Sequence, residues 1–392
     1  MEVKAGYKLS EVGVIPEDWA ATTLGEFLSL KRGHDLTGDQ RRPGDVPVMG
    51  SAGQNGFHDR ALVKAPGIVV GRSGASFGQA HYCGNDFWPH NTAMYVTDFR
   101  GNDPRYTFYF LRSLDFSRHN SGGAQQSLNR NFIYPIPIAV PPFAEQREIA
   151  AALLEVDALL AKLDRLIAKK RDLKQAQVHQ LLTGETRLPG FSGVWETRRV
   201  ASFSSFITKG ATPTTYGFGW EPSGVIFLRS ECVSANGLDL NQSMFISEQA
   251  HSELIRGEVR PGDILITITG NVGRVVLLDE RVGVGNINQH IARIRVNDAS
   301  VSPSFVFHWL SQPAVRHQYS TITTGQAYPQ ISLQQVRSTL IPLGSLAEQS
   351  AIAIVLSDVD ADLAALEARR DKTQLIKQGM MQELLTGMVR LI

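Results

Sequence analysis

The sequence predicts an α+β protein in which two β-rich domains are separated by two long antiparallel α-helices. The first observation is an ungapped match between the segments that start at Ala144 and at Ala347, both of which close with LLTG. The second is that the stretches between them contain short apolar runs bounded by Gly, Asn and Pro, which is typical of strands and turns. The third is length, since 392 residues exceed one ordinary domain. The order is therefore domain, helix, domain, helix, and two copies of one unit predict a pseudo-two-fold internal duplication.

The two matching segments have the apolar periodicity of long helices. Apolar residues recur at alternating steps of four and three, which places them on one stripe of each helix. We expect these stripes to form a helix-pair interface made of Ile149, Leu153, Val156, Leu160, Leu163 and Ile167 in the first helix and Ile352, Leu356, Val359, Leu363 and Leu366 in the second. Gly184 and Gly387 follow Leu-Leu-Thr, the position at which a helix ends in a left-handed conformation. A coiled coil between two copies of the chain is the alternative that this pattern leaves open.

The segments outside the helices read as mixed domains with curved sheets. Single short helices are expected at residues 106–114 and 305–310. Polar and basic residues gather near the turns, and Arg, Asn and Gln are the side chains that form paired hydrogen bonds with base edges. Turns are polar in any protein, so these residues are candidates for DNA binding and no more: Lys31, Arg32, His34, Arg41, Arg42, Arg72, Ser73, Gln125 and Gln126, then Lys209, Arg229, Thr269, Asn271, Gln326, Tyr328 and Gln330.

Charge and composition narrow the function classes. The net charge is +1. Proteins that coat nucleic acid without sequence preference are strongly basic, so this charge argues against that class. No apolar run reaches the length of a membrane-spanning helix, and the first residues lack the apolar stretch of a signal peptide, so we expect a cytoplasmic protein with no membrane partner. Cys83 and Cys232 lack zinc-ligand spacing, which predicts two reduced, partly buried thiols and no metal site.

Catalytic motifs are missing or incomplete, and we expect no catalytic residue in this chain. There is no Walker-type phosphate loop and no paired His-Glu helix motif. The segment VPPF, at residues 140–143, resembles the adenine-binding loop of amino-methyltransferases. That loop needs a polar first residue, whereas Val140 cannot accept a hydrogen bond with its side chain. We interpret VPPF as the rigid turn that leads into the first long helix.

Further motifs run along the whole chain: GVIPEDW, NGFHD, GRSG, FWPHNTAMYV, GGAQQSLN and IPIAVPPFAEQ, together with the repeated LLTG. With them the chain resembles the specificity subunit of type I restriction-modification systems. The resemblance spans essentially the full chain. Its most specific element is a Pro-rich turn, then Glu-Gln, then a long helix that ends in LLTG, present twice at half-chain separation.

The resemblance implies a division of labour. Two target recognition domains, residues 1–143 and 185–346, would each read one half of a split, asymmetric sequence in double-stranded DNA. Two spacer helices, residues 144–184 and 347–392, would pair and dock two copies of a methyltransferase (M) subunit, through which restriction (R) subunits join. The partners would use S-adenosylmethionine for adenine methylation and ATP for translocation. This chain would then be non-catalytic and bind no cofactor.

The two domains differ in one of these motifs, as expected if each domain recognises a different DNA sequence. The second has NINQHIA, residues 286–292, where the first has FWPHNTA. Two other functions remain open from the residues alone. One is a stand-alone sequence-specific DNA-binding protein, such as a regulator or an antirestriction decoy, which would bind DNA tightly without partners. The other is a structural protein whose helices only assemble oligomers, which would show no DNA selectivity.

Overall fold

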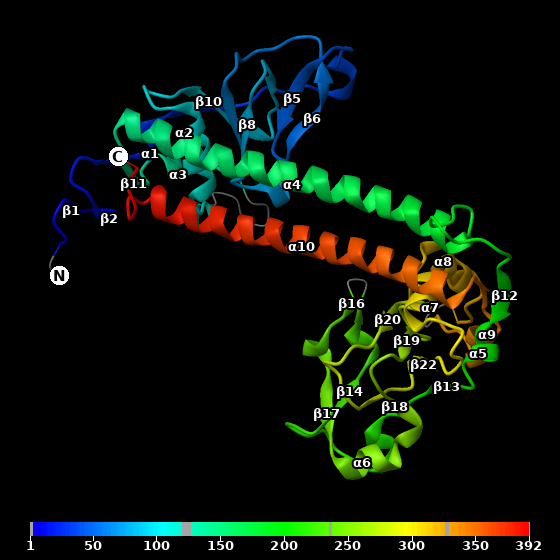
Figure 1. Cartoon of the computed structure of the whole chain (residues 1–392). Coiled ribbons are helices and arrows are strands. Elements are labelled where there is room, and N and C mark those ends of the chain that lie inside the picture. The colour runs from blue at the N-terminus through cyan, green and yellow to red at the C-terminus, as the bar shows by residue number, and fades with distance from the viewer. Residues whose placement is uncertain (1–2, 120–126, 235–236, 326–328, 392) are drawn as a thin grey trace. The chain divides into compact units, whose positions relative to one another are not determined.

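The computed structural model describes residues 3–119, 127–234, 237–325 and 329–391, and the chain forms two compact units (Figure 1). Unit 1 comprises Met1–Leu166 and Glu367–Ile392, and unit 2 comprises Ile167–Leu366. Each long helix therefore contributes residues to both units. The domain boundaries expected from the sequence treat each helix as a separate segment, and they stay a prediction.

A four-stranded antiparallel sheet forms the centre of unit 1. Its strand order is β4 (Ser29–Arg32), β10 (Ala93–Asp98), β7 (Gly67–Gly71) and β8 (Ala80–Cys83). A second sheet has the order β6 (Gly53–His58), β5 (Val46–Gly50) and β9 (Trp88–Pro89). The other elements are β1 (Tyr7–Ser10), β2 (Gly13–Pro16), β3 (Ala20–Thr23), α1 (Leu24–Phe27), α2 (Pro104–Ser113), α3 (Arg130–Ile133) and β11 (Pro137–Val140), with β3 paired to β11.

Unit 2 contains a four-stranded antiparallel sheet of the same kind. Its order is β13 (Phe206–Lys209), β22 (Ile291–Arg295), β19 (Ile264–Thr267) and β20 (Val275–Leu277). The second sheet of this unit is β17 (Met244–Ile246), β14 (Val225–Leu228), β21 (Gly285–Ile287) and β18 (Glu258–Val259). The remaining elements are β12 (Glu196–Arg199), α5 (Val200–Phe203), β15 (Val233–Ser234), β16 (Gly237–Leu238), α6 (Glu248–Glu253), α7 (Pro303–Leu310), α8 (Pro313–Thr321), α9 (Leu333–Ser338) and β23 (Leu340–Leu343).

The registers of the two four-stranded sheets make their positions comparable residue by residue. Met94 of β10 pairs with Arg32 of β4, and Ala292 of β22 pairs with Lys209 of β13. On their other sides the same two residues pair with Val70 and Ile266. Met94 and Ala292 therefore hold equivalent positions. Residues that lie the same number of positions before or after them in the sequence are equivalent as well.

The third strand of each sheet is buried on both faces. Ile264 and Ile266 of β19 belong to one apolar cluster and Leu265 to another, because successive side chains of a strand point to opposite faces. β7 repeats this pattern, with Val69 separated from Ile68 and Val70. Continuous apolar runs such as IVV and ILI are what a strand covered on both faces requires.

The two short helices expected from the sequence are confirmed as α2 and α7. Asp103 caps α2 by accepting hydrogen bonds from the backbone N–H groups of Arg105 and Tyr106, and Ser302 caps α7 by accepting from Phe305. Proline follows the cap in both helices, where its missing N–H costs nothing and its fixed φ favours the first turn.

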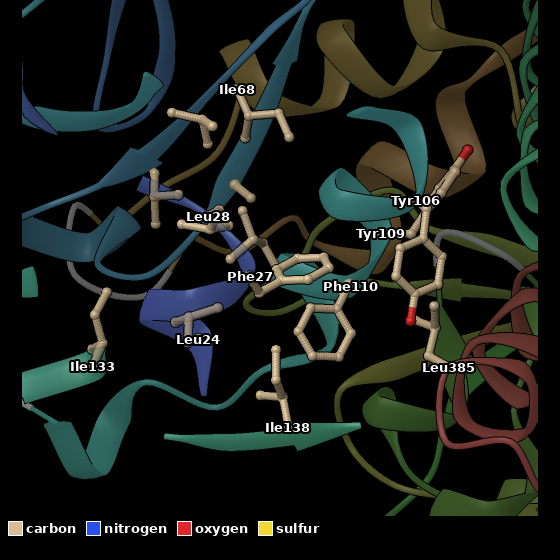
Figure 2. Close-up of a cluster of buried hydrophobic side chains, with 14 of the residues drawn as sticks. Leu24, Phe27, Leu28, Ile68, Tyr106, Tyr109, Phe110, Ile133, Ile138 and Leu385 are labelled. Atoms are coloured by element: carbon tan, nitrogen blue, oxygen red, sulfur yellow. The ribbon is translucent and has the colours of Figure 1, made fainter. Parts of the chain in front are cut away.

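The two long helices are α4 (Phe143–Thr183) and α10 (Leu346–Leu384). Gly184 and Gly387 follow them with φ of +74° and +73°, which confirms the predicted left-handed helix ends. The leucines before these glycines are anchors: Leu384 and Leu385 lie in the main core of unit 1, and the equivalent Leu181 and Leu182 lie in that of unit 2. Figure 2 shows Leu385 near Tyr109 among the buried side chains of this core. Each fully buried leucine stabilises its unit by roughly 1.5–3 kcal/mol.

Both cysteines are free and buried, as expected for reduced thiols. Burial raises the pKa of the Cys83 thiol to about 12, so this group stays protonated at neutral pH. Among the residues that the structure describes, none of the helices combines the length and the apolar character needed to cross a membrane.

Candidate nucleic-acid interface

A buried carboxylate lies at the start of α4. Glu145 is 5% exposed, and it accepts hydrogen bonds from the indole N–H of Trp19 at 2.9 Å and from the Arg390 guanidinium at 2.7 and 2.8 Å. Arg390 also donates to both oxygens of Asp18 at 2.9 Å. Its hydrogen bonds to Glu145 raise the pKa of Arg390, and its hydrogen bonds to Asp18 lower the pKa of that carboxyl. A buried charge is costly unless it is paired, so these contacts fix the start of α4 to the residues that follow α10.

Unit 2 contains the same arrangement. Glu348, which is fully buried, accepts from the indole N–H of Trp195 at 2.9 Å and from the Arg187 guanidinium at 2.5 and 2.6 Å. Burial alone would raise the pKa of Glu348, but the hydrogen bonds from Arg187 and Trp195 outweigh it and lower the pKa. We call these two groups the Trp–Glu–Arg clusters: Trp19, Glu145 and Arg390 in unit 1, and Trp195, Glu348 and Arg187 in unit 2.

Each Trp–Glu–Arg cluster joins the two repeats of the sequence. Glu145 opens the first helix and Arg390 follows the second, whereas Glu348 opens the second and Arg187 follows the first. The glutamine after each glutamate ties the same helix start to its own domain. Gln146 accepts from the backbone N–H of Asp103 at 2.9 Å, and Gln349 accepts from that of Ser302, also at 2.9 Å. The Glu-Gln pair thus positions α2 or α7, and with it the main sheet of each unit.

Ion pairs connect α4 with α10 inside each unit. Lys377 lies 2.6 Å from Asp157 in unit 1, and Lys174 pairs with Asp360 in unit 2. In unit 1, residues 145, 157 and 164 of α4 meet residues 390, 377 and 370 in that order, so the helices run antiparallel there. Unit 2 shows the same order, since Lys170 also pairs with Asp362. In each unit, segments of α4 and α10 from one chain are therefore paired by these ion pairs.

A side chain from the short helix completes each of these ion pairs. The Tyr109 hydroxyl of α2 donates to Asp157 at 2.7 Å. His308 takes the equivalent place in α7, with Nδ1 3.9 Å from Asp360 and Nε2 3.0 Å from the Ser357 hydroxyl. Burial lowers the pKa of His308 to about 4, although Asp360 opposes that shift. The imidazole is therefore neutral at physiological pH.

The predicted stripe of apolar residues contacts more than the partner helix. Ile149 and Leu153 belong to the main core of unit 1, and Ile352 and Leu356 belong to that of unit 2, together with many domain side chains. The remaining stripe residues are buried or half-buried: Leu160, Leu163, Ile167 and Leu363 are buried, and Val156, Val359 and Leu366 are half-buried. The role of the whole stripe as a helix-pair interface stays a prediction.

One end of the main sheet in unit 1 carries several candidate DNA-binding residues. β4 and β7 both end there because β10 runs antiparallel between them. Lys31 and Arg32 are exposed at the end of β4, and His34 follows with its Nε2 3.5 Å from the Tyr95 hydroxyl. Arg72 and Ser73 follow β7. The Arg72 guanidinium donates to the Asn91 carbonyl at 3.4 Å, and the Ser73 carbonyl accepts from the Ser51 hydroxyl at 2.7 Å.

The matching end in unit 2 carries another set of candidates. Lys209 is exposed at the end of β13. Thr269 follows β19 and forms a bridge with Gln330, which is exposed. Asn271 is exposed two residues later, and its carbonyl accepts from the Thr267 hydroxyl at 2.5 Å. The corresponding ends of the two main sheets thus carry polar side chains, but their contact with DNA stays a prediction.

Three candidate arginines are held by protein acceptors. Arg41 donates to the Asn55 carbonyl at 2.7 Å, and Arg42 lies 3.2 Å from the Asp59 carboxylate. Arg229 donates to the Gln242 carbonyl at 3.0 Å. A guanidinium has five donors, so these contacts leave some N–H groups for a further ligand. Four more candidates lie outside the described residues: Gln125, Gln126, Gln326 and Tyr328.

Comparison with known proteins identifies the family. Residues 16–169 and 194–377 match the family described as the type I restriction modification DNA specificity domain. The chain belongs to this family. Each match takes in one recognition domain and much of the helix that follows it, so the specificity-domain unit occurs twice in this specificity subunit.

Individual relatives agree with that assignment. The chain is 24% identical to a protein of Methanocaldococcus jannaschii named as the type I restriction enzyme MjaX specificity subunit, over 98% of this chain and 96% of that one. It is 27% identical to the Escherichia coli EcoBI specificity subunit over 55% of this chain and 49% of the relative. A crystal structure of a type I S subunit from M. genitalium has a TM-score of 0.66 at 17% identity, covering 96% of this chain and 98% of that one. At this identity the structural match supports the fold.

Some important residues of this specificity subunit were not expected from the sequence. No role was predicted for Trp19, Trp195, Arg187 or Arg390. The two arginines could have been found from their spacing, because each lies three residues after the glycine of LLTG. Asn91 and Gln289 were also missed. Aligning FWPHNTA with NINQHIA letter by letter sets Asn91 opposite His290, whereas the strand registers set it opposite Gln289.

Proposed function

We propose that this specificity subunit is the sequence-recognition component of a type I restriction-modification complex. In this proposal unit 1 reads one half of a bipartite, asymmetric double-stranded DNA target and unit 2 reads the other. Two copies of a methyltransferase subunit dock on the subunit, and the restriction translocase joins through them. The chain itself is non-catalytic. S-adenosylmethionine and ATP are bound and used by the partner subunits.

The observation that carries the proposal is that the two units share one arrangement of contacts and strands but differ in the side chains at one end of the main sheet. We call this end, where β4 and β7 of unit 1 and β13 and β19 of unit 2 terminate, the reading edge. The Trp–Glu–Arg clusters, the lysine–aspartate pairs and the main sheets are equivalent in the two units. At the sheet ends, however, the half-exposed Arg72 is equivalent to Ile268, whose side chain is buried, and Thr92 is equivalent to His290, because the two pairs of residues form the same backbone hydrogen bond. The shared arrangement supports the same role for both units. Because side chains determine which bases are recognised, the different residues at the reading edges support recognition of a different DNA sequence by each unit.

Exposed apolar residues at equivalent places support two identical docking partners. Phe143 at the start of α4 is 52% exposed, and its equivalent Leu346 at the start of α10 is 43% exposed. Leu173 and Ile376, near the other ends of the helices, are equivalent too and are 54% and 49% exposed. Unit 1 thus presents Phe143 and Ile376, and unit 2 presents Leu346 and Leu173. Large apolar side chains repeated on a surface are typical of protein interfaces.

The first experiment is single-molecule sequencing of host DNA with and without the gene, scoring methylated adenines. We expect one bipartite motif, methylated on both strands, to disappear when the gene is deleted. Native mass spectrometry of the complex purified through this subunit should show two methyltransferase copies. An unchanged methylation pattern, combined with sequence-specific DNA binding by the isolated chain, would favour a stand-alone DNA-binding protein.

A further inference from the structure

The corresponding ends of the two main sheets each carry a pair of hydrogen-bonded side chains. In unit 1, the Asn91 amide nitrogen donates to the Asp35 carboxylate. In unit 2, the Thr212 hydroxyl donates to the Gln289 carboxamide oxygen at 2.5 Å. Asn91 and Gln289 both lie just before the second strand of the main sheet, and both are half-exposed. In each unit, therefore, a carboxamide is held by a side chain from the loop that follows the first strand of the main sheet.

The strand registers show that these pairs are equivalent. Met94 and Ala292 hold equivalent places, so the residues three positions earlier, Asn91 and Gln289, are equivalent as well. Their tethers match in the same way. Arg32 and Lys209 are the equivalent partners of Met94 and Ala292, and Asp35 and Thr212 each follow by three residues.

Backbone contacts next to the pairs support the same alignment. The N–H of Arg72 donates to the Thr92 carbonyl at 3.0 Å, and the N–H of Ile268 donates to the His290 carbonyl at 2.9 Å. Gly33 and Gly210, two residues before the tethers, both pass so close to the backbone before the carboxamide that a Cβ would collide with a carbonyl. Both domains thus bring the tether near the carboxamide by a close backbone approach, to the carbonyl of His90 in unit 1 and, one residue earlier in the register, to that of Ile287 in unit 2.

The tether in unit 1 fixes which way the Asn91 amide faces. A carboxylate only accepts hydrogen bonds, so the amide nitrogen must face Asp35 and the amide oxygen must face away. One amide N–H and the amide oxygen then remain for a ligand. This donor–acceptor set is the one that matches N7 and N6 of adenine at the edge of the major groove.

The amide of Gln289 is fixed by two neighbours. Its oxygen accepts from Thr212, and its nitrogen lies 3.1 Å from Nε2 of His290. The amide oxygen has a second lone pair and the nitrogen a second hydrogen. Gln289 therefore keeps the same donor–acceptor set as Asn91.

Resting on the function proposed above, we propose that Asn91 and Gln289 are specificity-determining residues that each read one adenine, Asn91 in the half-site of unit 1 and Gln289 in that of unit 2. Asp35 and Thr212 are positioning residues, because they act by fixing the amides. Neither tether would contact the base itself.

Charge-exchange variants test this in the assembled complex with its methyltransferase, by sequencing methylated DNA from cells that carry each variant. Gln289→Glu keeps the oxygen that accepts from Thr212 but removes the amide donor. Asn91→Asp combined with Asp35→Asn keeps a hydrogen bond between the two side chains and makes residue 91 an acceptor only. An acceptor-only side chain matches the N4 amino group of cytosine. We expect preference for adenine at one position to fall by about 5- to 150-fold in one half of the motif, in favour of cytosine, with the other half unchanged.

Alanine variants and controls separate base reading from folding. Asn91→Ala and Gln289→Ala should lose the adenine preference at the same positions as the charge-exchange variants. Asn131→Ala and Asn241→Ala, at exposed asparagines elsewhere in unit 1 and unit 2, should leave the motif intact. Thermal melts of the purified variants would detect any that fail to fold.

The outcomes distinguish the inference from the proposed function. A wild-type chain that confers no methylated motif would refute the function and the inference with it. A wild-type bipartite motif that stays unchanged in both Gln289→Glu and the Asn91→Asp, Asp35→Asn variant would overturn the inference alone. A change confined to the predicted half of the motif would support both.

Discussion

Arg390 and Glu145 are 245 residues apart in the chain, yet two hydrogen bonds of 2.7 and 2.8 Å join them. Arg187 and Glu348 form the same contact in unit 2, 161 residues apart. In both cases the glutamate is buried, so the arginine is the charge that makes its burial tolerable. The integrity of each recognition domain therefore depends on the far end of the helix that belongs to the other repeat.

Replacing Arg390 with Ala should destabilise unit 1 selectively. The substitution leaves Glu145 buried without its countercharge, for which we expect a loss of about 3 kcal/mol. Hydrogen–deuterium exchange in β3 and at the start of α4 should rise, while β12 and the start of α10 keep their protection. Arg187→Ala should show the reverse pattern. The control is Arg281→Ala, whose ion pair with Asp279 is exposed to water and should contribute little to stability.

The two lysine–aspartate pairs should differ in strength. The Lys377 side chain is 7% exposed, whereas that of Lys174 is 34% exposed and more strongly screened by water. We expect Lys377→Met to cost about 2–3 kcal/mol and Lys174→Met to cost about 1 kcal/mol or less. Double-mutant cycles with Asp157→Asn and Asp360→Asn, read by urea unfolding, give the coupling energies. Equal coupling energies in the two units would contradict this ranking.

His308 should make unit 2 sensitive to mild acid. In the folded state its pKa is about 4, below the ordinary value of 6.5, so the unfolded chain takes up this proton first. The stabilisation is thus fully present above about pH 6.5 and is lost as the pH falls toward about 4, by roughly 3 kcal/mol in total. His308→Tyr copies the side chain at the equivalent Tyr109 and should flatten the difference in melting temperature between pH 7 and pH 4.5. An identical pH profile for wild type and variant would rule out this role.

The glycines after the long helices should respond unequally to substitution. Gly184→Ala and Gly387→Ala both place a Cβ on a left-handed residue, which costs roughly 1–2 kcal/mol. At Gly387 the added carbon would also lie 2.7 Å from Pro16 Cδ, closer than the 3.3 Å to Trp195 Cδ2 at Gly184. We therefore expect the larger fall in melting temperature for Gly387→Ala. A matched control is Gly38→Ala, where nothing lies near the added carbon and φ is not positive.

Exposed apolar residues on the helices should control the number of docked partners. Ile376→Asp alters only the set that unit 1 presents, and Leu173→Asp alters only the set that unit 2 presents. Each single variant should retain one methyltransferase copy in native mass spectrometry, and the double variant should retain none. A charge at an apolar interface must be desolvated without a partner, which explains the expected loss. Two copies bound to the double variant would place the docking surface elsewhere.

Much of the fold could be predicted because it follows from local patterns. The ungapped repeat gave both long helices, and Gly184 and Gly387 marked their ends. The Trp–Glu–Arg clusters could not be predicted, since nothing local shows that Arg390 returns to Glu145. Asn91 was missed for another reason: its equivalence to Gln289 depends on strand register, which a letter-by-letter alignment shifted by one residue. Arg41 and Arg229 looked like free cations in sequence, and only three-dimensional contacts revealed their carbonyl partners.

The division into units also bears on how the protein is made. Unit 2 is one continuous stretch, Ile167–Leu366, whereas unit 1 is interrupted by it. A ribosome releases every residue of unit 2 before it releases Leu384, Leu385 and Arg390. The two leucines complete the core of unit 1, and Arg390 pairs with the buried carboxylate of Glu145. The recognition domain that is synthesised first is thus the last to acquire its full set of contacts. Until Arg390 has been synthesised, Glu145 has no ion-pair partner from the end of the second helix.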